Sequence, residues 1–90
     1  MNKFVVMNLC SMSIEAVLYS ADDNLNCVEP FVTSAKARAE ELSEKSEGKQ
    51  SVDEIQSILL RPLYVLVNIG NERFKTFPLE LWQKDLSLDV

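Results

Sequence analysis

The sequence contains no histidine. The side chains that remain as candidates for catalysis or metal binding are two cysteines and fourteen carboxylates. Histidine is the usual general base and the commonest metal ligand, so no Ser-His or Cys-His pair can form. The cysteines, Cys10 and Cys27, are too far apart for a C-x-x-C motif and too few for a zinc site. Cys10 lies in an apolar run, where burial raises a thiol pKa. We therefore expect both cysteines to be buried, reduced thiols.

The carboxylates occur as neighbouring pairs and, in one place, at the spacing of a calcium-binding loop. Asp22, Asn24 and Asn26 match the first three ligands of such a loop. The match fails at Cys27, where the loop requires glycine, and at Thr33, where it requires a bidentate glutamate. Acid–base catalysis needs one carboxyl of a pair in an apolar pocket, and the pairs here lie in polar segments. The sequence therefore predicts no enzymatic activity, no metal and no cofactor.

The composition is that of a small acidic globular domain. Ninety residues with 47% hydrophobic and 26% charged side chains predict one domain that spans residues 1–90. The net charge of −5 and the scattered basic residues disfavour direct binding to nucleic acid or to an anionic membrane. No apolar run is long enough to span a membrane, and Asn8 interrupts the N-terminal apolar run. We expect a cytoplasmic protein.

The clearest structural signal is a β-hairpin over residues 63–77, where two runs of β-branched and aromatic residues flank Gly70-Asn71. A turn at this dipeptide pairs Val67 with Phe74 and gives the hairpin one apolar face. That predicted face consists of Val65, Val67, Ile69 and Phe74. The opposite face is mixed and consists of Leu66, Asn68, Arg73, Lys75 and Phe77. Because Arg73 and Lys75 are basic residues in an acidic protein, they are candidate contacts for a partner or a second copy.

Two more strands are predicted before the hairpin, at residues 3–10 and 14–20. The first has apolar residues on nearly both sides, which is typical of a central strand. The second places Ile14, Ala16 and Leu18 on one face, and a helix is its main alternative. A turn at Asp22-Asp23-Asn24 then leads to a third extended stretch, residues 25–32, in which Pro30 requires an edge or a strand end.

The first predicted helix begins after Thr33 or Ser34 and ends at Gly48. Its inner side is a thin stripe of small and apolar side chains, Ala35, Ala39 and Leu42. Its outer side carries a ridge of acidic side chains, Glu40, Glu44 and Glu47. This ridge is either a solvated helix face or a patch that binds a basic surface of another protein.

The second predicted helix opens with a capping box at Ser51-Val52-Asp53-Glu54 and closes at Pro62. Its inward-facing residues are predicted to be Val52, Ile55, Ile58 and Leu59.

After the hairpin, Pro78 begins a short helix that carries Leu79, Trp82 and Leu86 on one side. The last five residues alternate and could instead add an edge strand. Trp82 either covers the core or contacts a partner, since tryptophan is enriched at binding hot spots.

Together these patterns predict an α+β fold, an antiparallel sheet of four to six strands with two helices packed on one face, in the order β-β-β-α-α-β-β. The predicted function is that of a non-enzymatic interaction protein that binds and regulates or inhibits a larger protein partner. In size and composition the chain resembles the small acidic inhibitors of host restriction and CRISPR systems that phages and mobile elements encode, and DNA mimicry is a narrower form of this hypothesis. The alternative is a structural or accessory subunit that forms a homodimer or larger homo-oligomer. The candidate partner-binding residues are Glu40, Glu44, Glu47, Asp22, Asp23, Trp82, Arg73 and Lys75.

Overall fold

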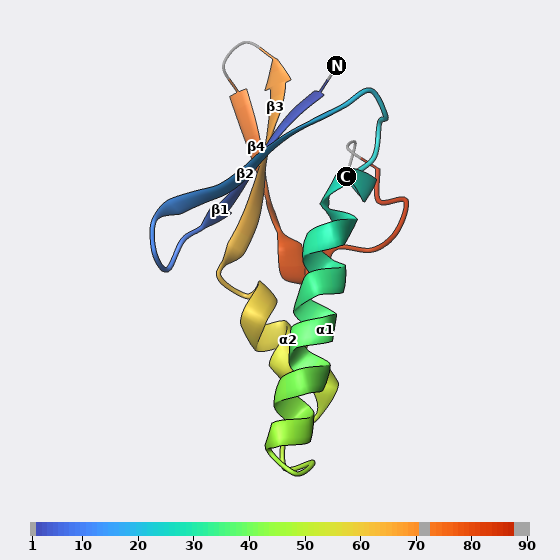
Figure 1. Ribbon diagram of the computed structural model, residues 1–90. Coiled ribbons are helices and arrows are strands. Elements are labelled where there is room, and N and C mark those ends of the chain that lie inside the picture. The colour runs from blue at the N-terminus through green and yellow to red at the C-terminus, as the bar shows by residue number, and fades with distance from the viewer. Residues whose placement is uncertain (1, 71–72, 88–90) are drawn as a thin grey trace.

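A computed structural model describes residues 2–70 and 73–87 of the chain and shows a four-stranded antiparallel sheet with two helices (Figure 1). The fold is therefore α+β, as predicted. The strands lie in the order β2-β1-β3-β4. In chain order the elements are β1 (Asn2–Asn8), β2 (Ser13–Ser20), the 3₁₀ turn η1 (Asn26–Val28), α1 (Glu29–Lys45), α2 (Val52–Leu60), β3 (Leu63–Gly70), β4 (Arg73–Pro78) and the 3₁₀ turn η2 (Leu79–Leu81).

The core lies against the inner face of the two central strands, β1 and β3. Phe4 pairs with Val67 and Val6 with Val65, and all four side chains are buried. Alternation along each strand directs these residues to one side of the sheet. The rest of the buried cluster comes from the segment before α1, the end of α2 and the turn after β4, and consists of Leu25, Val28, Leu60 and Leu79. Each buried aliphatic or aromatic side chain stabilises the fold by about 1.5–3 kcal/mol before entropy is counted.

The hairpin of β3 and β4 is confirmed, but its predicted register is wrong by one residue. Val67 pairs with Lys75 and Asn68 pairs with Phe74, because a β-bulge follows Asn68. A shift of one residue exchanges the two faces of a strand. Phe74 therefore lies on the outer face of the sheet, and Lys75 lies on the inner face. The predicted turn falls partly on residues 71–72, which lie outside the described residues.

A second β-bulge corrects the predicted face of β2, which is a strand rather than a helix. Val6 pairs with Ala16 and the next residue, Met7, pairs with Ile14, so that Glu15 is the extra residue. Ile14 consequently lies on the outer face of the sheet, away from Ala16. Ile14 is thereby exposed instead of being part of the core, whereas Ala16 packs against the core.

The predicted third extended stretch, residues 25–32, is wrong. It forms η1 and the first turn of α1, which begins at Glu29 rather than after Thr33 or Ser34. Pro30 fits this first turn because the amide hydrogen that it lacks would have no partner there. The element order thus has a 3₁₀ turn where a strand was predicted, and the described sheet has four strands, the lower limit of the predicted four to six. Apolar residues at helical spacing mark the true extent of the helix: Val28, Val32, Ala35, Ala39 and Leu42.

α2 begins and ends as predicted. The Ser51 hydroxyl accepts a hydrogen bond from the Glu54 amide at 3.2 Å, which caps the N-terminus. Ile55 is 5% exposed, in agreement with its predicted inward position. Ile58, also predicted to face inward, is 53% exposed, and Leu60 is buried instead. The cause is that the described neighbours of α2 lie on one side of it, so only a narrow stripe of the helix is covered.

The segment after β4 returns to the loop that follows β2. Ser87 forms an isolated antiparallel bridge with Asn24, and the Leu25 amide donates to the Leu86 carbonyl at 3.0 Å. A single 3₁₀ turn, η2, replaces the longer helix that the spacing predicted. The alternative prediction is that the last five residues add an edge strand. In the described part of this segment only the bridge between Ser87 and Asn24 is present, and residues 88–90 lie outside the described residues.

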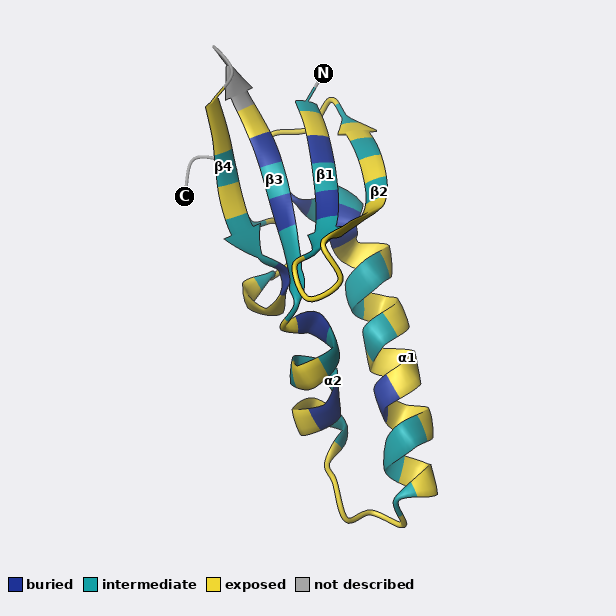
Figure 2. Cartoon of the chain, turned by 90° about the vertical axis from the view of Figure 1, so that its left-hand side faces the viewer, coloured by how far each residue is buried: buried dark blue, intermediate teal, exposed yellow. Residues whose placement is uncertain are grey.

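α1 and α2 form a hairpin that extends past the end of the sheet (Figures 1 and 2). The Cα atoms extend over 49 × 27 × 18 Å, with a radius of gyration of 14.2 Å. A compact domain of this length would have a radius of gyration of about 12 Å. Ala39 and Ile55 are buried, yet neither belongs to the cluster that packs on the sheet. The hairpin therefore has a small apolar contact of its own.

This contact can be tested with a matched pair of substitutions in α2. Ile55→Asp places a carboxylate in a buried position and is expected to cost more than about 4 kcal/mol, enough to unfold most domains of this size. Ile58→Asp makes the same chemical change at an exposed position and should shift stability by less than about 1 kcal/mol. Urea unfolding followed by circular dichroism measures both. Equal losses in the two variants would show that α2 does not pack as described.

Candidate interaction surfaces

The predicted partner-binding residues do not come together in one place. Glu40 and Glu44 lie one turn apart on the exposed side of α1, near its C-terminal end. Asp22 and Asp23 lie in the loop after β2, at the opposite end of the molecule (Figure 1). The other candidates lie on β4 and after η2. The structure therefore presents several separate surfaces, which differ in charge and in exposure.

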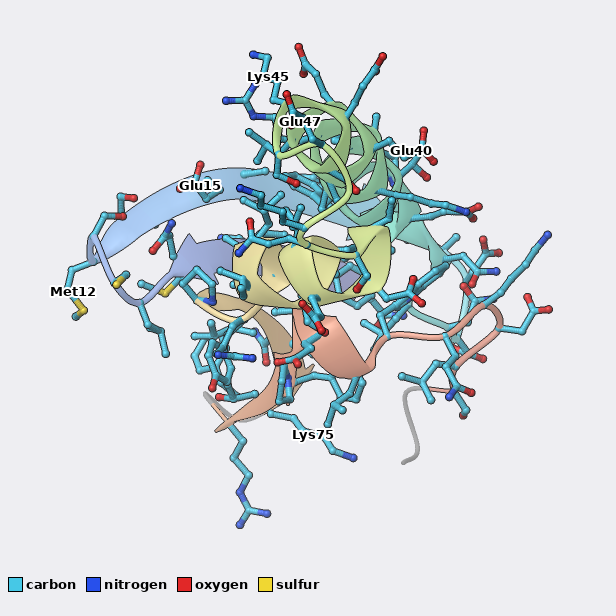
Figure 3. The ribbon with its side chains drawn as sticks, turned by 90° about the horizontal axis from the view of Figure 1, so that it is seen from below. Met12, Glu15, Glu40, Lys45, Glu47 and Lys75 are labelled. Carbon is cyan, nitrogen blue, oxygen red and sulfur yellow. The ribbon has the colours of Figure 1, made fainter. Side chains whose placement is uncertain are left out.

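The end of the helical hairpin, residues 40–54, concentrates the charge of the protein, and we call it the acidic tip. It contains six carboxylates and two lysines, a net charge of −4 out of −5 for the whole chain. All eight charged residues are exposed. Figure 3, viewed from below, shows Glu40, Lys45 and Glu47 pointing outward from α1 in different directions. These charged residues are Glu40, Glu41, Glu44, Lys45, Glu47, Lys49, Asp53 and Glu54.

The chain reverses at the acidic tip through two residues with left-handed backbone conformation, Glu47 (φ 58°) and Gly48 (φ 78°). The Gly48 amide donates to the Ser43 carbonyl at 3.1 Å, and the Ser43 hydroxyl donates to the Gln50 carbonyl at 2.7 Å. These bonds hold the loop against the end of the helix. Glu47 therefore lies beyond the end of α1, and the predicted helical ridge consists of Glu40 and Glu44 alone.

The outer side of the sheet is apolar and uncovered, and we call it the open face. In Figure 2 the four strands lie in front and no helix crosses them on that side. Four of its side chains are strongly exposed: Tyr19 and Ile14 at 63%, Phe74 at 56% and Val17 at 45%. By register and alternation the face consists of Lys3, Val5, Met7, Ile14, Val17, Tyr19, Tyr64, Leu66, Asn68, Phe74 and Thr76.

The described residues of the open face include no carboxylate, and Lys3 is their single charge. The bulged Glu15 points away from the sheet beyond the free edge of β2 (Figure 3). An apolar groove of about 530 Å³ continues the face at the end of the sheet and shares Tyr64 with it. The other residues that line this groove are Leu9, Cys10, Ile58, Arg61 and Pro62.

Sequence reasoning found only part of the open face: Leu66 and Asn68 lie on the mixed face predicted for the hairpin, but the contribution of β1 and β2 was missed. Residues 3–10 are apolar on both sides, which predicts a central strand, and β1 is central in the sheet. The same pattern fits a central strand of a sheet that is covered on one side only. The two bulges, which no sequence rule locates, then add Ile14 and Phe74 to the uncovered side.

Trp82 lies at the margin of the core rather than on an exposed surface. Its ring is half-buried against the core cluster, and its Nε1 donates to the Leu25 carbonyl at 2.9 Å. Next to it, Asn26 and Asp85 exchange two hydrogen bonds of 2.7 and 2.8 Å. These contacts attach the C-terminal segment to the loop before α1. The geometry gives Trp82 a structural role here.

The two basic candidates on β4 also differ in exposure. Arg73 is exposed next to the hairpin turn, and Lys75 is half-buried on the inner side of the sheet, where it pairs with Val67. Figure 3 shows Lys75 far from the acidic tip. Because a lysine can bury its aliphatic stem and keep its ammonium in water, Lys75 covers part of the core at the edge of the sheet.

The two cysteines are both free, and the prediction that Cys10 is buried is wrong. Cys10 is exposed in the turn after β1, and Cys27 is half-buried in η1. Burial raises the pKa of the Cys27 thiol above its ordinary value of 9.0, the charge of Asp22 raises it further, and a backbone hydrogen bond opposes the shift. Cys27 is thus a poorly reactive thiol at neutral pH.

Comparisons with family models, curated proteins and solved structures found no match to this chain. Among the described residues, no group of three or more metal-ligating side chains lies close enough to hold an ion. No helix in the described ranges is long and apolar enough to cross a membrane. The acidic tip and the open face are the two surfaces of the described chain that indicate a function.

The contact of Trp82 with Leu25 can be tested with Trp82→Phe, which keeps an aromatic ring and removes the N–H donor. The loss of one hydrogen bond at a buried carbonyl should lower the free energy of unfolding by about 1 kcal/mol. The Leu25 carbonyl keeps its second donor, the Val28 amide, so a larger loss is not expected. Thermal unfolding measures the difference. An unchanged midpoint would show that the indole N–H is not bonded as described.

Thiol labelling tests the assignment of the cysteines. With an aromatic disulfide reagent at pH 7, Cys10 should react quickly and Cys27 slowly; Cys10→Ser should remove the fast phase and Cys27→Ser the slow one. Because folding raises the pKa of Cys27, its contribution to stability is complete below pH 9.0 and is lost as the pH rises through the folded pKa. Equal rates for both thiols would contradict the assignment.

Proposed function

We propose that this protein is a non-enzymatic, cytoplasmic interaction protein that binds a larger protein partner through its acidic tip and regulates or inhibits that partner. The observation that supports this proposal is the segregation of charge. The acidic tip has a net charge of −4, and the remaining 75 residues have a net charge of only −1. A globular fold does not require such a division.

The geometry of the hairpin supports binding to a basic surface. The acidic tip lies at the far end of a molecule 49 Å long, where a partner can approach without contacting the sheet (Figure 1). Charges of one sign that lie close together add their potentials and accelerate the encounter with an oppositely charged protein. The side chains of Arg38 and Glu41 form an ion pair of 3.3 Å between exposed groups, which contributes little to stability. The acidic side chains therefore remain available to a partner.

A partner that itself binds nucleic acid is a narrower form of the proposal. Such proteins bind phosphates with clusters of lysine and arginine, and the six carboxylates of the acidic tip could occupy the same clusters. In this narrower hypothesis the protein inhibits a host-defence protein by imitating the phosphates of DNA. Binding of this kind should weaken strongly with salt and should be competed by duplex DNA. Binding that is insensitive to salt and to DNA would exclude the DNA-mimic version and leave the broader proposal standing.

The experiment that tests the proposal is a charge reversal with a matched control. A triple variant, Glu40→Lys, Glu44→Lys and Glu47→Lys, should lose at least tenfold in recovery of the partner in a quantitative pull-down from the native cell. The reason is that three attractive charges become repulsive in the binding surface.

The control reverses three exposed acids elsewhere, Glu15→Lys, Asp22→Lys and Asp23→Lys, and has the same net charge as the test variant. Its recovery of the partner should stay near that of the wild type. Equal loss in both variants would show that net charge, and not the acidic tip, determines binding. No loss in either variant would contradict the proposal.

A second function, that of a homo-oligomerising structural or accessory subunit, is favoured by a different observation, the open face.

A further inference from the structure

The open face is a largely apolar surface that crosses the sheet, from Ile14 and Val17 on β2 through Val5 and Met7 on β1 to Tyr64 and Leu66 on β3. Its polar residues Lys3 and Asn68 lie at one end, between Tyr19 and Phe74. Large exposed apolar patches on soluble domains mark interaction sites. We propose that a second copy of this chain covers the open face, so that two sheets pack face to face in a symmetric dimer. This surface is separate from the acidic tip, so the proposal does not depend on binding of a partner there; it rests on the second function proposed above, homo-oligomerisation, and names the surface that is used.

The distribution of charge favours a second copy as the occupant. The described open face has no carboxylate and one lysine, Lys3, although the chain contains fourteen acidic residues. Depletion of charge is characteristic of the buried centre of protein interfaces. Two such faces can pack together without burying an acidic group, so that contact between copies carries no large desolvation cost.

The acidic tips do not oppose this arrangement. Both helices lie on the side of the sheet away from the open face (Figures 1 and 2), so the two hairpins are on the outside of the dimer. The two hairpins are therefore offset from each other by at least the spacing of two packed sheets, about 10 Å. That separation exceeds the Debye length of about 8 Å at physiological salt, and repulsion between the tips is therefore screened.

The area of the open face agrees with a reversible dimer. Four strands about 4.8 Å apart and seven residues of about 3.3 Å each give a face of roughly 19 by 23 Å. Two such faces remove roughly 900 Å² of flat area from water, and protruding side chains add to this value. Specific interfaces begin near about 1,000 Å². We therefore expect a dissociation constant in the micromolar range.

Face-to-face packing is also the form of self-association that this sheet permits best. The edge strand β2 has a bulge at Glu15 in its ladder with β1, and the other edge strand, β4, has Arg73 and ends at Pro78. Bulges, charged residues and prolines are features that prevent strands from pairing at an edge. A contact in which both copies use the same face has two-fold symmetry, so it forms a closed dimer and no larger assembly.

Sedimentation velocity of the wild-type chain between about 1 and 500 µM tests the proposal directly. The expected result is a shift from monomer to dimer as the concentration rises, with no larger species. A monomer throughout this range, or assembly beyond the dimer, would overturn the proposal.

Two variants identify the surface that is used. Val17→Glu and Phe74→Glu, on opposite edges of the open face, should each weaken dimerisation at least tenfold, because each places a carboxylate in both halves of an apolar contact. The matched control is Leu81→Glu, since Leu81 is 63% exposed but lies on η2 rather than on the open face. Circular dichroism confirms that each variant is folded.

Leu81→Glu should dimerise like the wild type. A dimer that persists unchanged in folded Val17→Glu and Phe74→Glu would show that another surface is used and would overturn the proposal. The charge reversal at the acidic tip should leave dimerisation unchanged, so failure of this proposal can be told apart from failure of the proposed function.

Discussion

The rest of this structure depends on one constraint, the covering of the sheet on a single face. A four-stranded antiparallel sheet is stable in water when its second face is polar, and alternating apolar and polar residues are the usual solution. Here β1 is apolar on both sides, with Phe4 and Val6 inside and Val5 and Met7 outside. The core is complete on the inner side, because the described helices and 3₁₀ turns pack there. The outer side has the apolar composition of a second interior without any element of the described chain to cover it.

The same constraint explains why the segment after β4 is attached to the segment before α1 by several hydrogen bonds. The hairpin of α1 and α2 extends past the sheet, so part of the inner face has to be covered by something else. That part is covered by residues 79–87, which are attached to the loop before α1. The hydrogen bond from Trp82 to the Leu25 carbonyl and the paired bonds of Asn26 with Asp85 connect positions 57 and 59 residues apart. A small domain with few buried side chains depends strongly on such long-range contacts.

The sequence predicted the elements that local rules determine and failed where register determines the outcome. The capping box of α2, the strands of the hairpin and the α+β class depend on short patterns, and all were found. The sequence predicts an extended stretch at residues 25–32 with Pro30 at an edge or a strand end, although a proline fits the first turn of a helix equally well. The bulges near Glu15 and Asn68 each shift one strand by one residue, and each moves an apolar side chain to the open face. A pattern of period two cannot locate such an insertion.

The division of charge links the two surfaces. Most of the net charge is carried by the acidic tip, so the other 75 residues have a net charge of only −1 and two sheets can approach each other without strong repulsion. Had the same carboxylates been spread evenly, some would face the contact between copies and oppose it. A dimer built through the open face would also present two acidic tips on its outside, and a partner with two basic sites would be bound with an increased effective concentration at the second site. In the two proposals, the placement of acid on the hairpin would therefore serve both surfaces, since it would attract a basic partner and leave the sheet free to pair.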